Sequence, residues 1–171
     1  ALPASELPLL SADEREQMRA WQGRDLPGFG DISFLDRLTA QVDSTPHRVA
    51  IEFRDDQITF QQLHERANQV AAFLATQGVG PEILVGVFME RSVEMVVALL
   101  GILKAGGAYV PLDPEYPEDR IGFMLEDTKI AIQLTQGTLR DRLPQTGARV
   151  WCLDTDWNQF ELLSTEQMPV P

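Results

Sequence analysis

The sequence predicts an α/β protein with a doubly wound, mainly parallel sheet and helices on both faces. Short apolar segments alternate with amphipathic helical segments from residue 83 onward, with glycines and prolines between them. Residues 83–89 form a nearly continuous apolar run, which is typical of a strand buried on both faces. Because repeated strand–helix–strand units need right-handed crossovers, these strands are expected to run parallel.

Residues 1–30 are expected to form an interdomain linker that carries one short helix. Ser11 and Glu14 have the spacing of a capping box, in which each side chain accepts a hydrogen bond from a backbone amide at the helix start. Met18 and Trp21 follow on one helix face, and Gly23 ends the helix.

A second helix and a hairpin are expected next. The helix begins near Asp31 or Ser33 and stops before Pro46, because the residue before a proline avoids the α region. Residues 49–53 and 58–60 are rich in β-branched and aromatic side chains and predict two short strands about a tight turn.

The third helix starts at a second capping box, formed by Thr59 and Gln62. Gly78 and Gly80 end it. The apolar side chains at helical spacing, which predict its buried stripe, are Leu63, Ala67, Val70, Ala71 and Leu74.

Strands and helices alternate through the rest of the chain. Ser92 is expected to cap a helix that runs to Lys104, and residues 108–110 to form the next strand. Pro117, at a first helical position, opens another helix. Two more strands are predicted at residues 130–135 and 149–153. Residues 156–171 sustain no period and predict a loop that leaves the sheet.

Composition disfavours nucleic acid and membrane partners. The chain has 171 residues, enough for one domain or one and a part, with 14 basic and 26 acidic residues and a net charge of -12. Binding to phosphates needs a basic patch, whereas this chain starts from net repulsion. Glu90, Arg91, Ser92 and Glu94 interrupt the most apolar region, so no membrane span is expected.

The cysteine and histidine content favours a reducing cytosol. Cys152 is the single cysteine, so no internal disulfide can form, and with only His47 and His64 beside it the usual zinc ligand sets cannot be assembled. Cys152 is expected to be a small buried thiol in a core strand. The two histidines are expected to be solvated or satisfied rather than catalytic.

The glycines lie in the wrong order relative to the helices and strands for a phosphate loop. Such a loop follows a strand and precedes a helix, whereas Gly78, Gly80, Gly106 and Gly107 each follow a helix and precede a strand. They are expected to be left-handed C-caps. Lys104 is expected to interact favourably with the helix dipole rather than with a nucleotide.

Two polar segments fall at the edge of the sheet where doubly wound folds bind ligands, residues 90–92 and 113–116. Local structure explains both: Ser92 is a good N-cap, and Asp113 between Leu112 and Pro114 is a turn former. We therefore expect no catalytic, cofactor-binding or metal-binding residue in this chain.

Two segments carry a family resemblance. One consists of Leu103, Lys104, Ala105, Gly106, Gly107, Ala108, Tyr109, Val110, Pro111, Leu112 and Asp113, followed by Pro114. It resembles the second core motif of amino-acid adenylation domains in nonribosomal peptide synthetases. The other consists of Ile58, Thr59, Phe60, Gln61, Gln62 and Leu63. It resembles the first core motif, with three departures at Ile58, Phe60 and Gln62 that keep its apolar character and its capping box. The roles expected for these residues are structural.

The resemblance extends over nearly the whole chain and implies a layout. Residues 1–30 are similar to the linker between a condensation domain and an adenylation domain. Residues 31–155 are expected to be the N-terminal part of the large subdomain of an adenylate-forming (ANL-type) enzyme. Residues 156–171 are expected to lead toward a phosphate-binding loop beyond Pro171.

The resemblance also implies an activity for a longer, cytoplasmic parent protein. Such an enzyme uses ATP and magnesium to convert an amino acid to an aminoacyl adenylate, and then loads the acyl group on the phosphopantetheine of a carrier domain. Its partners are expected to be the condensation and carrier domains and an MbtH-like helper protein.

The family's groups for ATP and for the amino acid are all expected beyond Pro171. The 171-residue piece is therefore expected to be inactive and, because its sheet is open-ended, to expose apolar surface. Two alternatives remain: a fragment of an acyl-CoA or aryl-acid ligase, which shares the fold, and a non-enzymatic interaction module.

Overall fold

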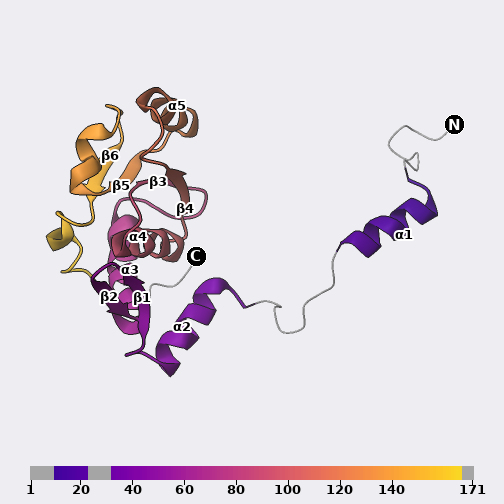
Figure 1. Ribbon diagram of the computed structural model, residues 1–171, viewed down its shortest axis with the longest axis horizontal. Coiled ribbons are helices and arrows are strands. Elements are labelled where there is room, and N and C mark those ends of the chain that lie inside the picture. Colours follow the sequence, from indigo (N-terminus) through magenta and orange to yellow (C-terminus); the bar gives the residue numbers. More distant parts are fainter. Residues whose placement is uncertain (1–9, 23–31, 167–171) are drawn as a thin grey trace. The chain divides into compact units, whose positions relative to one another are not determined.

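The computed structural model describes residues 10–22 and 32–166, and it divides the chain into two units, residues 1–34 and 35–171. The first unit holds helix α1, Ala12–Trp21, none of whose residues is buried (Figure 1). The predicted capping box is present: the Ser11 N–H donates to Glu14 Oε2 at 2.7 Å, and the Glu14 N–H donates to Ser11 Oγ at 3.2 Å. The hydrogen bonds that Glu14 accepts lower its pKa. Gly23 lies outside the described residues.

The second unit begins within helix α2, Phe34–Ser44, which is followed by an antiparallel hairpin of β1, Val49–Phe53, and β2, Asp56–Thr59. The helix stops before Pro46 as predicted. The hairpin turn is tight because Arg54 takes a left-handed conformation with φ of 56°. The predicted second strand, residues 58–60, ended one residue too late, because Phe60 is the first residue of the next helix.

Helix α3, Phe60–Thr76, confirms the second capping box. The Thr59 N–H donates to Gln62 Oε1 at 2.9 Å, and the Gln62 N–H donates to Thr59 Oγ1 at 3.2 Å. The predicted stripe is buried as expected, and Phe73, Asn68 and Gln69 are buried with it.

Four parallel strands form the main sheet in the order β4-β3-β5-β6 (Figure 1). The strands are β3, Leu84–Phe88; β4, Ala108–Leu112; β5, Ile132–Thr135; and β6, Arg149–Cys152. Their connections are helix α4, Val93–Lys104; helix α5, Glu118–Thr128; and the 3-10 helix η2, Gly137–Arg142. The parallel α/β prediction is confirmed.

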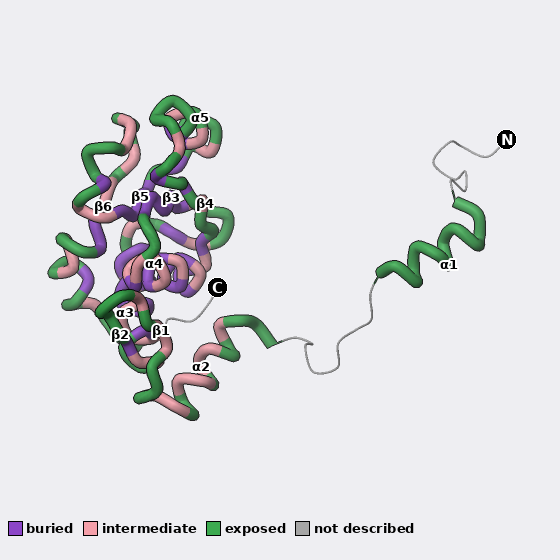
Figure 2. Tube along the Cα trace, viewed as in Figure 1, coloured by how far each residue is buried: buried purple, intermediate pink, exposed green. Residues whose placement is uncertain are grey.

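Helices cover both faces of this sheet, so the doubly wound arrangement is confirmed. Val85 and Val87 of β3 belong to the larger core cluster, which contains the buried sides of α3 and α4. Phe88 belongs to the cluster on the opposite face, where it packs with Ile121 of α5 and Leu139 of η2. Figure 2 shows the buried residues concentrated on β3 and β5 and on α3 and α4.

Several element limits differ from the sequence prediction. Strands β3, β5 and β6 are shorter than predicted, β4 extends to Leu112, and Pro117 is the N-cap of α5 rather than its first residue. After β6 the chain is more regular than predicted: it forms the 3-10 helix η3, Trp157–Gln159, and Phe160 is fully buried. The prediction failed here because aromatic packing, rather than a hydrophobic period, fixes this segment.

The glycine prediction is half right. Gly78 and Gly106 have positive φ values of 87° and 80°, as C-caps should. Gly80 and Gly107 are not left-handed. Gly107 is required for a different reason: a Cβ atom there would lie 2.6 Å from Val79 Cγ1, so only glycine allows this close approach.

Candidate functional site

The carboxyl edge of the sheet contains a topological switch point between β3 and β5. The chain leaves β3 toward the face covered by α4 and leaves β5 toward the face covered by η2, so the ends of these adjacent strands form a topological switch point. Doubly wound folds bind ligands in the crevice at that point.

Hydrogen bonds of two side chains connect the two strand ends at this switch point. The Glu90 N–H, after β3, donates to Gln136 Oε1, after β5, at 2.8 Å. Thr135, at the end of β5, donates its buried hydroxyl to the Phe88 carbonyl at 2.7 Å. These two hydrogen bonds join the ends of β3 and β5 at the switch point.

The polar segments predicted at this edge have structural roles. Ser92 caps α4, with its hydroxyl accepting from the Met95 N–H at 3.1 Å. Asp113 forms a turn by accepting from the Glu115 N–H at 2.9 Å. Arg142 of η2 donates to the Pro114 carbonyl at 2.5 Å, which holds that turn against the neighbouring connection.

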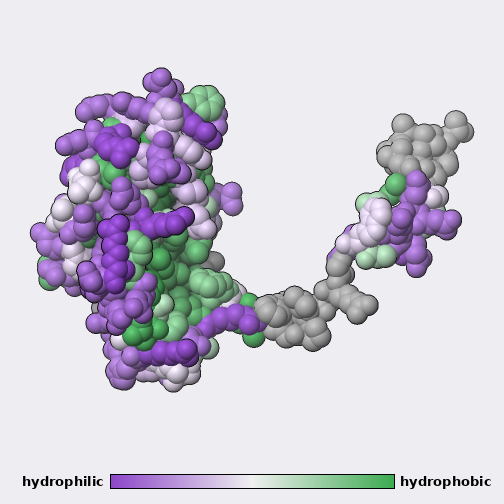
Figure 3. Space-filling view, viewed as in Figure 1, coloured by the Kyte–Doolittle hydropathy of each residue, from purple (hydrophilic) through white to green (hydrophobic). Residues whose placement is uncertain are grey.

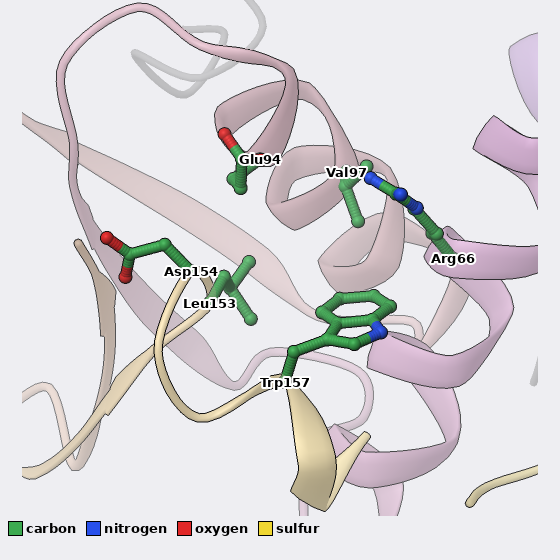
Figure 4. Close-up of a pocket in the computed structure, with 6 residues that line it drawn as sticks. All are labelled: Arg66, Glu94, Val97, Leu153, Asp154 and Trp157. Atoms are coloured by element: carbon green, nitrogen blue, oxygen red, sulfur yellow. The ribbon is translucent and has the colours of Figure 1, made fainter. Parts of the chain in front are cut away.

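A hollow of about 320 Å³ lies on the same edge, on the side of the sheet covered by α3 and α4. Its lining residues are Arg66, Glu94, Val97, Leu153, Asp154 and Trp157 (Figure 4). Figure 4 shows an apolar floor of Val97, Leu153 and the Trp157 ring between the guanidinium of Arg66 and the carboxylate of Asp154.

Most charges in this hollow already have partners. The Arg66 guanidinium lies over the Trp157 ring, 5.7 Å from its centroid. Both oxygens of Asp154 accept from the Gly137 N–H, at 2.9 and 3.1 Å. The lining contains no Ser, Cys or His, so the hollow can receive an amphipathic group but has no hydroxyl or thiol nucleophile paired with a histidine base.

Lys104 is the main residue whose environment could not be predicted from the sequence, because its side-chain amine is buried. Its side chain is only 3% exposed, and its Nζ lies 3.4 Å from Nδ1 of His64 on α3. Burial lowers the pKa of Lys104 to about 8. The pKa of His64 is lowered, mainly by burial and then by the nearby charge of Lys104. The charges of Asp43 and Glu65 act in the opposite direction and raise it.

Lys104 sits in the last turn of α4, as predicted. The structure adds that its side chain faces the protein interior. His64 is half-buried against it rather than on a solvated helix face, and it is satisfied by this contact. Sequence spacing could not show this, because the pair joins positions 40 residues apart.

The structure places the remaining motif residues in two structural clusters. Thr59 and Gln62 are the capping box of α3, with Ile58 and Leu63 buried on either side and Phe60 as the first helical residue. The second motif runs from the end of α4 into β4. Its residues are Leu103, Lys104, Ala105, Gly106, Gly107, Ala108, Tyr109, Val110, Pro111, Leu112 and Asp113.

The other candidate ligands stay apart from one another. Cys152 is buried, as predicted, and burial raises the pKa of its thiol. Across residues 10–22 and 32–166, no three His, Cys, Asp or Glu side chains come together in a way that could hold a metal ion. In the same ranges, no helix has the length and apolarity needed to cross a membrane.

Comparison with known proteins identifies the family. A profile described as "AMP-binding enzyme" matches residues 38–170, and the chain belongs to this family. Within it, the resemblance to nonribosomal peptide synthetases is confirmed. The chain is 47% identical over 154 residues to a linear gramicidin synthase of Brevibacillus parabrevis and 41% identical over 173 residues to tyrocidine synthase 3 of the same species.

Solved structures agree with this assignment. The AMPPNP-bound form of the nonribosomal peptide synthetase FmoA3 superimposes with a TM-score of 0.81 at 34% identity, over 94% of this chain and 17% of that one. The Klebsiella oxytoca NpsA N-terminal subdomain, at 21% identity and a TM-score of 0.72, has the same fold over 87% of this chain and 37% of that one.

The chain spans only a small part of these relatives. The match to the linear gramicidin synthase covers 90% of this chain and 3% of the synthase, and the match to tyrocidine synthase 3 covers 96% of this chain and 3% of that protein.

Proposed function

We propose that this chain is the N-terminal portion of an adenylation domain that activates an amino acid in nonribosomal peptide synthesis. The observation that carries the proposal is the match of residues 38–170 to AMP-binding enzymes, combined with 47% identity to a peptide synthetase over 90% of the chain. The second core motif, which forms the α4–β4 connection, supports it.

In the proposed reaction the amino-acid carboxylate attacks the α-phosphorus of ATP, and pyrophosphate leaves to give the aminoacyl adenylate. The phosphopantetheine thiol of a carrier domain then takes the acyl group, and AMP leaves. Magnesium would neutralise phosphate charge in the first step.

The residues of this chain do not fit the groups that this chemistry needs. At the switch point Gln136 accepts from the Glu90 N–H, and the described residues offer no carboxylate cluster for magnesium. We therefore assign ATP, magnesium and amino-acid binding to the parent chain beyond Pro171 and assign to this chain no catalytic, cofactor or metal residue.

This chain instead supplies the scaffold. The two core motifs cap α3 and join α4 to β4, so their residues hold one face of the parallel sheet together. The proposed division is the one predicted from the sequence: a linker over residues 1–30, the subdomain portion over 31–155, and a connecting segment over 156–171. Condensation and carrier domains, and an MbtH-like helper, are the proposed partners in a cytoplasmic synthetase.

The ligase alternative has weaker support. The relatives at 41–47% identity are peptide synthetases, which favours activation of an amino acid over the ligase alternative. A binding module without enzymatic activity has no specific observation in its favour.

Amino-acid-dependent exchange of labelled pyrophosphate into ATP tests the proposal. The protein that contains this chain and the rest of its adenylation domain should catalyse exchange with at least one amino acid, and the 171-residue chain alone should not. Exchange by the 171-residue chain would overturn the scaffold assignment. Exchange that depends on an aryl or fatty acid instead of an amino acid would favour the ligase.

A further inference from the structure

Helix α3 holds the segment that follows η3 through two side-chain amides. Asn68 Nδ2 donates to the Thr165 carbonyl at 2.6 Å, and Gln69 Nε2 donates to the Glu161 carbonyl at 3.0 Å. Neighbouring helix residues point about 100° apart, so the two amides approach the segment from two directions. We call residues 161–165 the tethered segment.

The tethered segment starts from a rigid anchor. Phe160 is fully buried and lies 4.5 Å from Phe73 of α3 and 5.7 Å from Trp157, measured between ring centroids. Leu163 packs against the same core. The aromatic anchor fixes where the segment begins, and the two amides fix the direction in which it runs.

Asparagine is a poor choice for position 68 with respect to the stability of the fold. Asn68 is 1% exposed within a helix, where asparagine is a poor helix former and a buried carboxamide must be hydrogen-bonded. Its neighbours on the buried side, Ala67 and Val70, are apolar. Among the described residues, Asn68 Oδ1 has no hydrogen-bond partner, so the bond that Asn68 donates to Thr165 is what offsets the burial of this side chain.

We infer that Asn68 and Gln69 are positioning residues for the adenylation reaction, because they set the course of the chain from η3 toward the ATP-binding part of the parent domain. The inference rests on the proposed function. We assign neither residue a contact with substrate. Each acts through the main chain of the tethered segment, which makes the effect independent of the segment's own side chains.

The test compares three variants of the full adenylation domain. Asn68→Ala and Gln69→Ala each remove one tether. Thr165→Ala is the matched control, because the tether ends on the Thr165 carbonyl and not on its hydroxyl. Exchange kinetics should show KM for ATP raised about fivefold to tenfold by the first two variants, with KM for the amino acid unchanged and the control unaffected.

Hydrogen–deuterium exchange gives a readout that does not depend on activity. Amides of residues 161–166 should exchange faster in Asn68→Ala and Gln69→Ala, while those of β3 and β5 stay protected. Gln69, at 9% exposure, is the variant that tolerates substitution if Asn68→Ala does not fold.

The outcomes separate the inference from the proposed function. A wild-type parent with no pyrophosphate exchange activity would overturn the function, and the deuterium result would then still decide whether the tether exists. Unchanged deuterium exchange of residues 161–166 in both variants would overturn the inference. So would faster deuterium exchange together with equal rises in KM for both substrates, because that pattern indicates a structural role only.

Discussion

Lys104 and His64 form a titratable pair inside the protein, where α3 meets α4. Both pKa values lie below the ordinary values of 10.5 and 6.5, so the unfolded chain binds more protons than the folded chain does. For Lys104, the free energy of unfolding should rise with pH between about 8 and 10.5. For His64, stability is fully present above 6.5 and is lost as the pH falls below it.

Urea unfolding at about pH 7, 8, 9 and 10 checks the Lys104 part. The wild-type free energy of unfolding should rise by up to about 1.4 kcal/mol per pH unit above pH 8, relative to Lys104→Met, in which this titration is absent. Groups far from Lys104 titrate equally in the two proteins, so the difference isolates Lys104. Parallel profiles would show that the Lys104 amine is not held at a depressed pKa.

The close packing of Gly107 against Val79 can be tested by substitution. In Gly107→Ala the new methyl group would meet Val79 Cγ1 at 2.6 Å and the Ile83 carbonyl at 3.2 Å, so the variant should lose about 1–3 kcal/mol in urea unfolding. Gly147→Ala is the matched control, since nothing lies within 4 Å of its Cβ position. Adding Val79→Ala should restore part of the loss, and a Gly107→Ala variant as stable as the control would contradict the close approach.

At the scale of elements, the cap of α3 can be tested alone. Thr59→Ala removes the hydroxyl that accepts from Gln62 N–H and should cost about 1 kcal/mol in thermal or urea unfolding. Thr59→Ser keeps an oxygen at that position and should stay within a few tenths of a kcal/mol of the wild type. Equal losses in the two variants would mean that the threonine methyl group, not the cap, matters.

Caps and strand–helix order were predictable because they depend on residues a few positions apart. Ser11, Thr59 and Ser92 each bond to a residue three positions later, and the structure confirms all three. Contacts between distant positions were not predictable. Asn68 meets Thr165 across 97 residues, and the ring of Phe160 packs on Phe73, so the ordered course after β6 was missed.

At the scale of the whole molecule, residues 95–103 of α4 are apolar on every side of the helix, which is typical of a helix buried all round. Yet Met95, Val96 and Leu99 are only partly buried, and Tyr109 on the edge strand β4 is 42% exposed. Figure 3 shows hydrophobic side chains gathered on the viewed face over α4. Because the chain covers 17% of the FmoA3 chain that it matches, we expect other parts of the parent domain to cover this face.

The chain on its own should therefore self-associate or bind a hydrophobic dye. Val96→Lys places a charge on the apolar face and should reduce both the dye signal and the apparent mass in sedimentation. Gln61→Lys adds the same charge at an exposed position and should change neither. The parent domain should show little dye binding with or without Val96→Lys, unless that substitution disrupts its packing and raises the signal. A monomeric 171-residue chain with cooperative melting and no dye signal would show that α4 needs no further cover.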